Sequence, residues 1–152
     1  MPYTNAEART QLLDVMAGAV DQLGISLGML EGAYELLDDS TADALESDLF
    51  RPVQLAYGRA KRTYADFAER SKLEAREFEP APPGAPARGA KGLIDGAVSA
   101  AAEADKELAD LQDSMLPVEV GDPQLRAGLE QVRELIGGMP GRARELLRTL
   151  GR

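Results

Sequence analysis

Residues 12–37 read LLDVMAGAVDQLGISLGMLEGAYELL and decide the fold class. Apolar side chains recur there at steps of three and four, which is the spacing of one face of an α-helix. This pattern continues for about seven turns before the polar residues 38–41 interrupt it. We therefore predict a helix over about 5–38. Its apolar face consists of Leu12, Met16, Val20, Leu23, Leu27, Leu30, Tyr34 and Leu37.

Three further stretches show the same periodicity, and none alternates like a β-strand. Pro52 lies inside the second stretch and the sequence GGMPG (137–141) inside the fourth, yet the apolar spacing stays in phase across both. Such residues kink a helix. The sequence thus predicts an all-α four-helix bundle. Two long kinked helices are expected at about 5–38 and 42–78, and two shorter ones at about 91–115 and 123–150, the last sharply kinked.

A proline-rich segment separates the two pairs of predicted helices. Residues 79–90 read EPAPPGAPARGA and contain four of the nine prolines in the chain. We expect a stiff linker that joins two helical hairpins within a single domain, 1–152. At about 3.1 Å per residue its reach is roughly 37 Å. That length suffices either for a local turn or for crossing the bundle, so the order of the helices stays open.

The composition excludes several classes of chemistry. The 152 residues include no His and no Cys, and 26 acidic residues against 17 basic ones give a net charge of −9. Histidine catalysis, thiol catalysis and zinc sites built from Cys or His are therefore excluded. The negative charge disfavours nucleic-acid binding. We expect no cofactor, no metal, no catalytic residue, no membrane span and no signal peptide, hence a cytoplasmic location. Abundant Ala and Arg favour a bacterial origin.

A second face of the first predicted helix is unusual, because it combines apolar side chains with glycines. Each glycine inside a helix costs about 1 kcal/mol relative to alanine. Glycines at steps of four let another backbone approach closely. That backbone can belong to the same fold, or to a second copy or another protein. The leading hypothesis is a non-enzymatic interaction or assembly protein, such as a homodimer. Its interface would comprise Gly24, Ile25, Gly28, Met29, Gly32 and Leu36.

The alternative function is a carrier for an apolar or aromatic small molecule bound between helices. Four aromatic residues of the second predicted helix would line its pocket, namely Phe50, Tyr57, Tyr64 and Phe67. The same residues would equally serve as a broad core face with phenol groups near solvent.

Two pairs of acidic residues suggest a third function. Glu74-x-x-Glu77 and Glu107-x-x-Asp110 resemble the paired acidic motifs of all-α nucleotide pyrophosphohydrolases, which implies a Mg²⁺-dependent phosphohydrolase. The positions of the two acidic pairs on their predicted helices oppose this function. Glu77 ends its predicted helix, whereas Glu107 lies roughly 24 Å along the next one.

The last predicted helix carries arginines near its end, at Arg142, Arg144, Arg148 and Arg152. Cations there complement the helix dipole. Alternatively, they form a tail that docks on an acidic partner.

Overall fold

The computed structural model describes residues 5–120 and 122–150, and over these residues the chain is helical with no strand. The fold is therefore an all-α bundle. Its α-helices are α1 (Asn5–Tyr34), α2 (Asp39–Leu45), α3 (Arg51–Arg70), α4 (Gly89–Asp113), α5 (Leu116–Glu119), α6 (Pro123–Gly137) and α7 (Met139–Leu150). A π-helical turn, η1 (Glu46–Phe50), joins α2 to α3, and a 3₁₀ turn, η2 (Pro86–Arg88), precedes α4.

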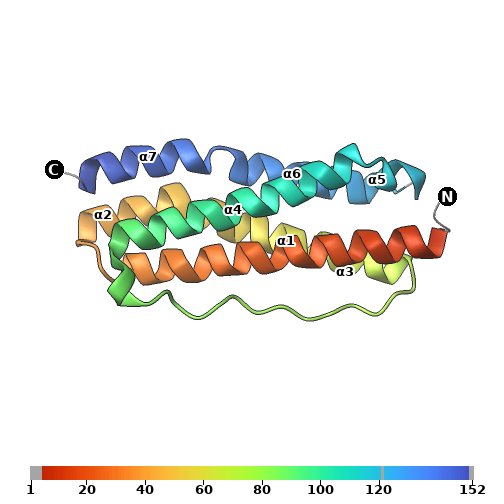
Figure 1. The fold of residues 1–152 in the computed structure, drawn as a ribbon, viewed down its shortest axis with the longest axis horizontal. Coiled ribbons are helices and arrows are strands. Elements are labelled where there is room, and N and C mark those ends of the chain that lie inside the picture. Colours follow the sequence, from red (N-terminus) through yellow and green to blue (C-terminus); the bar gives the residue numbers. More distant parts are fainter. Residues whose placement is uncertain (1–4, 121, 151–152) are drawn as a thin grey trace.

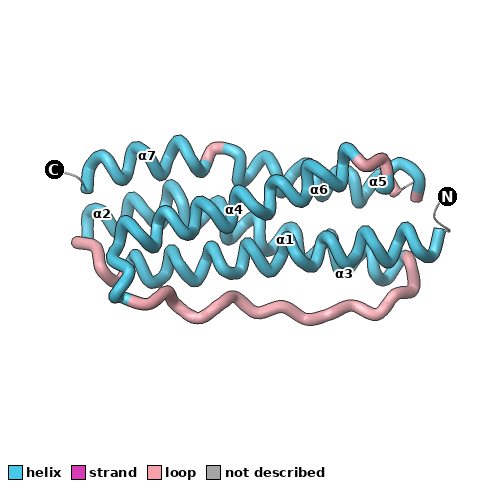
Figure 2. The backbone as a smooth tube through the Cα atoms, viewed as in Figure 1, coloured by secondary structure: helices cyan, strands magenta, loops and turns pink. Residues whose placement is uncertain are grey.

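Four long helical segments pack side by side (Figure 1). Helix α1 packs against α3 and, most extensively, against α4, while α6 packs against the same two helices. Helices α3 and α4 run in the same direction, so the connection between them crosses the whole length of the bundle beside α1 (Figures 1 and 2). The helix order that the sequence left open is thereby decided.

The predicted apolar faces form the core. Its largest fully buried side chains come from every long helix, and include Leu12, Leu23 and Leu30 of α1, Phe67 of α3, Leu93 and Leu108 of α4, Leu125 and Leu129 of α6, and Met139 of α7. One polar group ties two helices together inside this core, since the buried Ser26 hydroxyl donates to the Ala97 carbonyl oxygen at 2.8 Å. Periodicity therefore predicted the buried faces of the bundle.

The second helix passes through Pro52 without a break, as predicted. The proline ring has no N–H and clashes with the carbonyl group of the preceding turn. The chain accommodates it by widening that turn into η1, where the Arg51 N–H donates to the Glu46 carbonyl oxygen. Asp38 caps the start of this helix by accepting from the Thr41 N–H at 2.7 Å.

The end of the second helix was predicted wrongly, since it lies at Arg70 and not near Phe78. Lys72 adopts a left-handed conformation with φ of 55°. The N–H of Leu73 then donates to the Ala68 carbonyl oxygen at 2.9 Å, and the N–H of Lys72 to the Glu69 carbonyl oxygen at 3.1 Å. These two bonds form a Schellman termination, so the connection to α4 begins well before the proline-rich stretch.

Two other ends of the predicted helices also differ from the structure. Helix α1 stops at Tyr34, and the predicted 123–150 helix is divided at Gly138 into α6 and α7. The sharp kink expected there is thus a complete break. Both halves still face one core, through Val132 and Ile136 of α6 and through Met139 of α7.

Helix α1 is long and apolar enough to span a membrane by length and composition, unlike the expectation from the sequence. The share of its most apolar 18-residue window that is buried inside the bundle is 61%. A central helix of a bundle has this same character. The cytoplasmic location remains a prediction.

Candidate functional site

The glycine side of α1 is covered by the chain's own connection. A Cβ atom added at Gly28 would lie 2.6 Å from the Pro82 carbonyl oxygen, and one added at Gly32 would lie 2.6 Å from the Gly84 carbonyl oxygen. The Gly84 N–H donates to the Gly28 carbonyl oxygen at 2.9 Å. The close backbone approach predicted from the glycines is therefore real. The backbone that approaches is an internal one, which corrects the placement of a partner on these glycines.

The remaining residues of the predicted interface are divided. Met29 is half-buried between α1 and α4, where its sulfur lies against Gly96 and 3.8 Å from an Arg88 guanidinium nitrogen. Ile25 and Leu36 stay exposed, at 36% and 42% of their surface. They are eleven positions apart. The predicted interface therefore leaves two separate apolar side chains exposed, Ile25 on α1 and Leu36 just beyond its end, and not a continuous seam.

Aromatic residues hold the beginning of the connection. The Phe78 ring packs edge-on against the Tyr64 ring, with centroids 5.0 Å apart. The Arg76 N–H donates to the Tyr64 hydroxyl at 3.1 Å, and the Arg76 guanidinium pairs with Asp21 on α1. The connection is thus fastened to α3 and α1 before it reaches the glycines.

The aromatic row expected to line a ligand pocket is largely core. Tyr57, Tyr64 and Phe67 are each at most 5% exposed, so they fill space inside the bundle, which corrects that part of the carrier hypothesis. Burial raises the pKa of the Tyr57 phenol, and the charges of Asp21 and Glu79 raise it further. Phe50 differs from these three residues, because it borders a pocket.

The paired acidic motif is not assembled. Glu74 and Glu77 lie in the extended connection, so they do not share a helix face. Glu107 lies on α4 against Gly18 of α1, and burial raises the pKa of its carboxyl group, with added effects from Glu103 and Asp21 that Lys106 opposes. Over residues 5–120 and 122–150, no three carboxylates gather closely enough to hold a metal ion.

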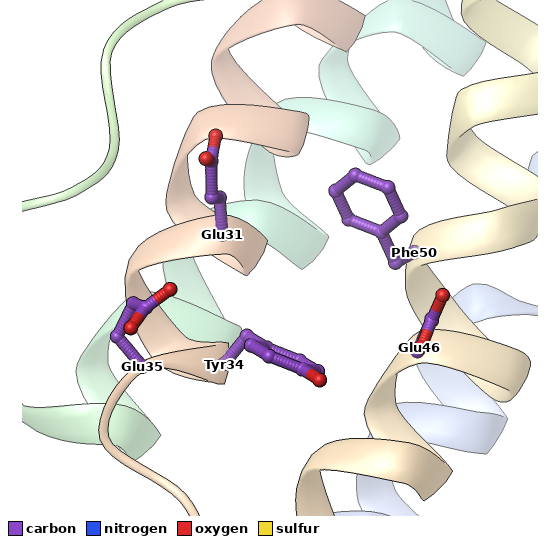
Figure 3. A pocket seen from close by; sticks show the side chains of 5 residues that line it. All are labelled: Glu31, Tyr34, Glu35, Glu46 and Phe50. Carbon is purple, nitrogen blue, oxygen red and sulfur yellow. The ribbon is translucent and has the colours of Figure 1, made fainter.

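A pocket that the sequence did not predict lies between the C-terminal end of α1 and the π-helical turn (Figure 3). Its volume is about 320 Å³. Tyr34 and Phe50 extend from the two helices into the space between them (Figure 3). We call it the acidic pocket, and its lining residues are Glu31, Tyr34, Glu35, Glu46 and Phe50.

The stretch of chain that lines the acidic pocket is strongly negative. Residues 31–50 hold seven acidic residues and no basic one. These are Glu31, Glu35, Asp38, Asp39, Asp43, Glu46 and Asp48. The pocket also adjoins the C-terminus of α1, the negative end of that helix dipole. This run of acidic residues is visible in the sequence and indicates a negative surface. The pocket itself forms only where α1 packs against η1.

The chemistry of the acidic pocket suits an organic cation. Aromatic faces attract cations, and carboxylates accept hydrogen bonds from guanidinium and ammonium groups. Its volume lies at the lower end of the usual range for ligand pockets. Short π-helical segments such as η1 occur frequently at functional sites. An arginine or lysine side chain therefore fits both the size and the charge of the pocket.

Comparison with known proteins gives no match to any family model, curated protein or solved structure.

Proposed function

We propose that the protein is a non-enzymatic interaction protein whose acidic pocket receives basic side chains of a partner protein. The observation that carries the proposal is that three glutamates and two aromatic residues line one open hollow. Residues 31–50, which include all five lining residues, contain no basic side chain. Such a site favours a guanidinium group, because this group is both positively charged and planar.

The energetics favour a partner with several basic residues. An exposed ion pair contributes about 0.2–1 kcal/mol, and an exposed cation–π contact about 0.5–1 kcal/mol. One ion pair and one cation–π contact together contribute at most about 2 kcal/mol, which is well short of the roughly 4 kcal/mol that a millimolar dissociation constant requires. A basic segment that also contacts the acidic surface around the pocket would bind more tightly. Its binding would weaken with salt, because exposed charges are screened.

A fluorescein-labelled hexa-arginine peptide tests this proposal by fluorescence anisotropy. We expect saturable binding at low salt, weakened at least tenfold in the double variant Glu35→Gln/Glu46→Gln. The control is Glu119→Gln/Glu134→Gln, which removes two exposed charges from α5 and α6. Because both variants change the net charge equally, only a pocket explains a difference between them. Equal weakening by both would reduce the binding to general attraction and refute the site.

Self-association is the second candidate function, and the charges of α7 favour it. A hollow on α7 is bordered by Arg144, Glu145, Leu147 and Arg148. Glu145 pairs with Arg148, so Arg144 and Leu147 supply the cation and the apolar side chain for a second copy. This surface complements the acidic pocket, so α7 of one copy would dock on the pocket of another. Light scattering after size-exclusion chromatography should then give twice 16.3 kDa at low salt. The variant Arg144→Gln/Arg148→Gln should give a monomer. A monomer for the unaltered chain at every concentration would leave a different protein as the partner.

A further inference from the structure

The connection between α3 and α4 touches the bundle at every third residue. Phe78 packs on Tyr64, the Ala81 N–H donates to the Gly24 carbonyl oxygen at 3.2 Å, and the Gly84 N–H donates to the Gly28 carbonyl oxygen at 2.9 Å. These three inward residues are half-buried. A spacing of three residues is the repeat of a polyproline II helix.

The prolines of this segment impose that conformation. Each proline fixes its own φ near −65°, and each residue before a proline is restricted to extended conformations. Prolines stand at positions 80, 82, 83 and 86. Ala85, which precedes the last of them, has φ of −66° and ψ of 129°. Residues 78–85 therefore form a polyproline II strand that lies along α1, as the path in Figure 2 shows.

The other two edges of this strand face away from the bundle. All residues of these edges are exposed. They form the dipeptides Glu79-Pro80 and Pro82-Pro83 and, at the end of the strand where η2 begins, Ala85-Pro86. Each dipeptide ends in proline and is separated from the next by one inward residue. The fastening of the strand uses Phe78 and the N–H groups of Ala81 and Gly84, so it does not use the proline rings. We call these exposed dipeptides the proline ridge.

We propose that the proline ridge is a recognition surface for a partner domain with a groove lined by aromatic side chains. Such grooves accept the X-Pro dipeptides of a polyproline II helix. A helix with three residues per turn has three edges, and a groove that holds two of them leaves the third free. In this protein α1 holds the third edge. The ridge can therefore be bound without lifting the connection from the bundle.

The proline ridge is recognised through its shape and not through the neighbouring cation. Arg88 follows Pro86 by two residues, but its guanidinium group is turned back onto the bundle, where it donates to the Met29 sulfur at 3.8 Å and to the Gly92 carbonyl oxygen at 3.5 Å. Since the ridge is already ordered, binding requires little further loss of conformational freedom. The folded chain is therefore a better ligand than a free peptide of the same sequence.

The test uses a panel of purified SH3 and WW domains, which have aromatic-lined grooves that read Pro-x-x-Pro segments. Each is titrated, by calorimetry, with the full chain and with a synthetic peptide of residues 76–90. We expect at least one domain to bind the full chain at least fivefold more tightly than the peptide. The variant Pro83→Ala/Pro86→Ala should lose at least tenfold in affinity, whereas Pro140→Ala on α7 should leave it unchanged.

A second measurement keeps the outcome clear if the double variant loosens the connection. Hydrogen exchange at the Ala81 and Gly84 amides should stay slow when the domain is bound, because α1 still holds the inward edge. Binding to the peptide but not to the full chain would overturn the proposal, since α1 would then block the groove. Absence of binding to either, across the panel, would also overturn it and leave the segment as a structural strap.

Discussion

Two surfaces of α1 differ in how the rest of the chain uses them. Along Gly24, Gly28 and Gly32 the helix is covered by the connection, with backbone against backbone. At its C-terminal end Glu31 and Tyr34 border an open pocket. The glycines, which are costly in a helix, are explained by an internal contact with the connection. No internal contact explains the acidic and aromatic residues of the pocket, so a partner is expected at the C-terminal end of α1.

The covered surface works because a carbonyl oxygen has two lone pairs. The Gly24 and Gly28 carbonyl groups stand inside α1, and each also accepts an N–H from the connection. This second bond requires close approach, which a side chain at Gly28 would prevent. At the acidic pocket no close backbone contact restricts the side chains, so residues that bind a partner can occupy these positions.

The largest effect is expected from Gly28→Leu, which would force the connection off α1. We expect it to lower the free energy of unfolding by more than about 3 kcal/mol, since overpacking and the lost bonds add. Urea denaturation measures this. Gly58→Leu on α3 is the matched control, because no atom lies within 4 Å of a Cβ there, and it should be neutral or stabilising. A stable Gly28→Leu protein that loses only self-association would mean that the glycines face a partner.

Phe78→Ala should have the next largest effect, because it removes the aromatic contact that fastens the start of the connection. We expect a loss of about 1–2 kcal/mol in the free energy of unfolding. Hydrogen exchange at the Ala81 amide should accelerate as well. Leu55→Ala, at a side chain that is 56% exposed, is the control and should change stability by less than about 0.5 kcal/mol. Unchanged exchange at Ala81 would show that the glycine contacts suffice alone.

A third contact on α1 involves Glu107 of α4, whose partly buried carboxyl group lies against Gly18. The variant Glu107→Gln tests the effect of its charge on stability. Because the pKa of Glu107 is raised in the folded state, ionisation at neutral pH opposes folding. The variant should therefore be more stable at pH 7, by less than about 1 kcal/mol. This gain should shrink as the pH falls through the titration range of Glu107, since both states then hold the proton. A gain that is independent of pH would contradict the assignment.

The smallest effect on stability is expected at the open end, from Tyr34→Leu. Tyr34 is 39% exposed, so the free energy of unfolding should change by less than about 0.5 kcal/mol. Binding of the hexa-arginine peptide should nevertheless weaken, because the cation–π contact is lost. A marked loss of stability with unchanged binding would make the ring a structural element and would remove the contrast between the two surfaces.

Local sequence signals predicted some element ends and failed at others. Pro52 and the glycines at 137 and 138 marked a distorted turn and a break where the structure has them. The end of α3 had no such signal, since Lys72 and not glycine takes the left-handed position. Phe78 falls at a helical spacing from the preceding apolar residues only by coincidence. Its ring packs on Tyr64 from an extended segment, and apolar spacing alone cannot distinguish this arrangement from a continued helix.

The candidate sites, like the helix ends, were only partly predictable from the sequence. The glycine spacing revealed that a backbone approaches α1, but not which backbone. The acidic pocket joins Glu31 and Tyr34 of α1 to Glu46 and Phe50 of η1. No short motif contains both pairs, and only the packing of η1 on α1 brings them together.

The sequence by itself determined the helical class, the buried faces and the stiffness of the connection, because these depend on interactions between residues near in the chain. Only the tertiary structure decided that the connection crosses the bundle along α1. That choice follows from the parallel arrangement of α3 and α4, which requires a long return, and from the carbonyl groups of α1 that can bond it. The covered glycines and the proline ridge depend on that arrangement, whereas the acidic pocket depends on the packing of η1 on α1.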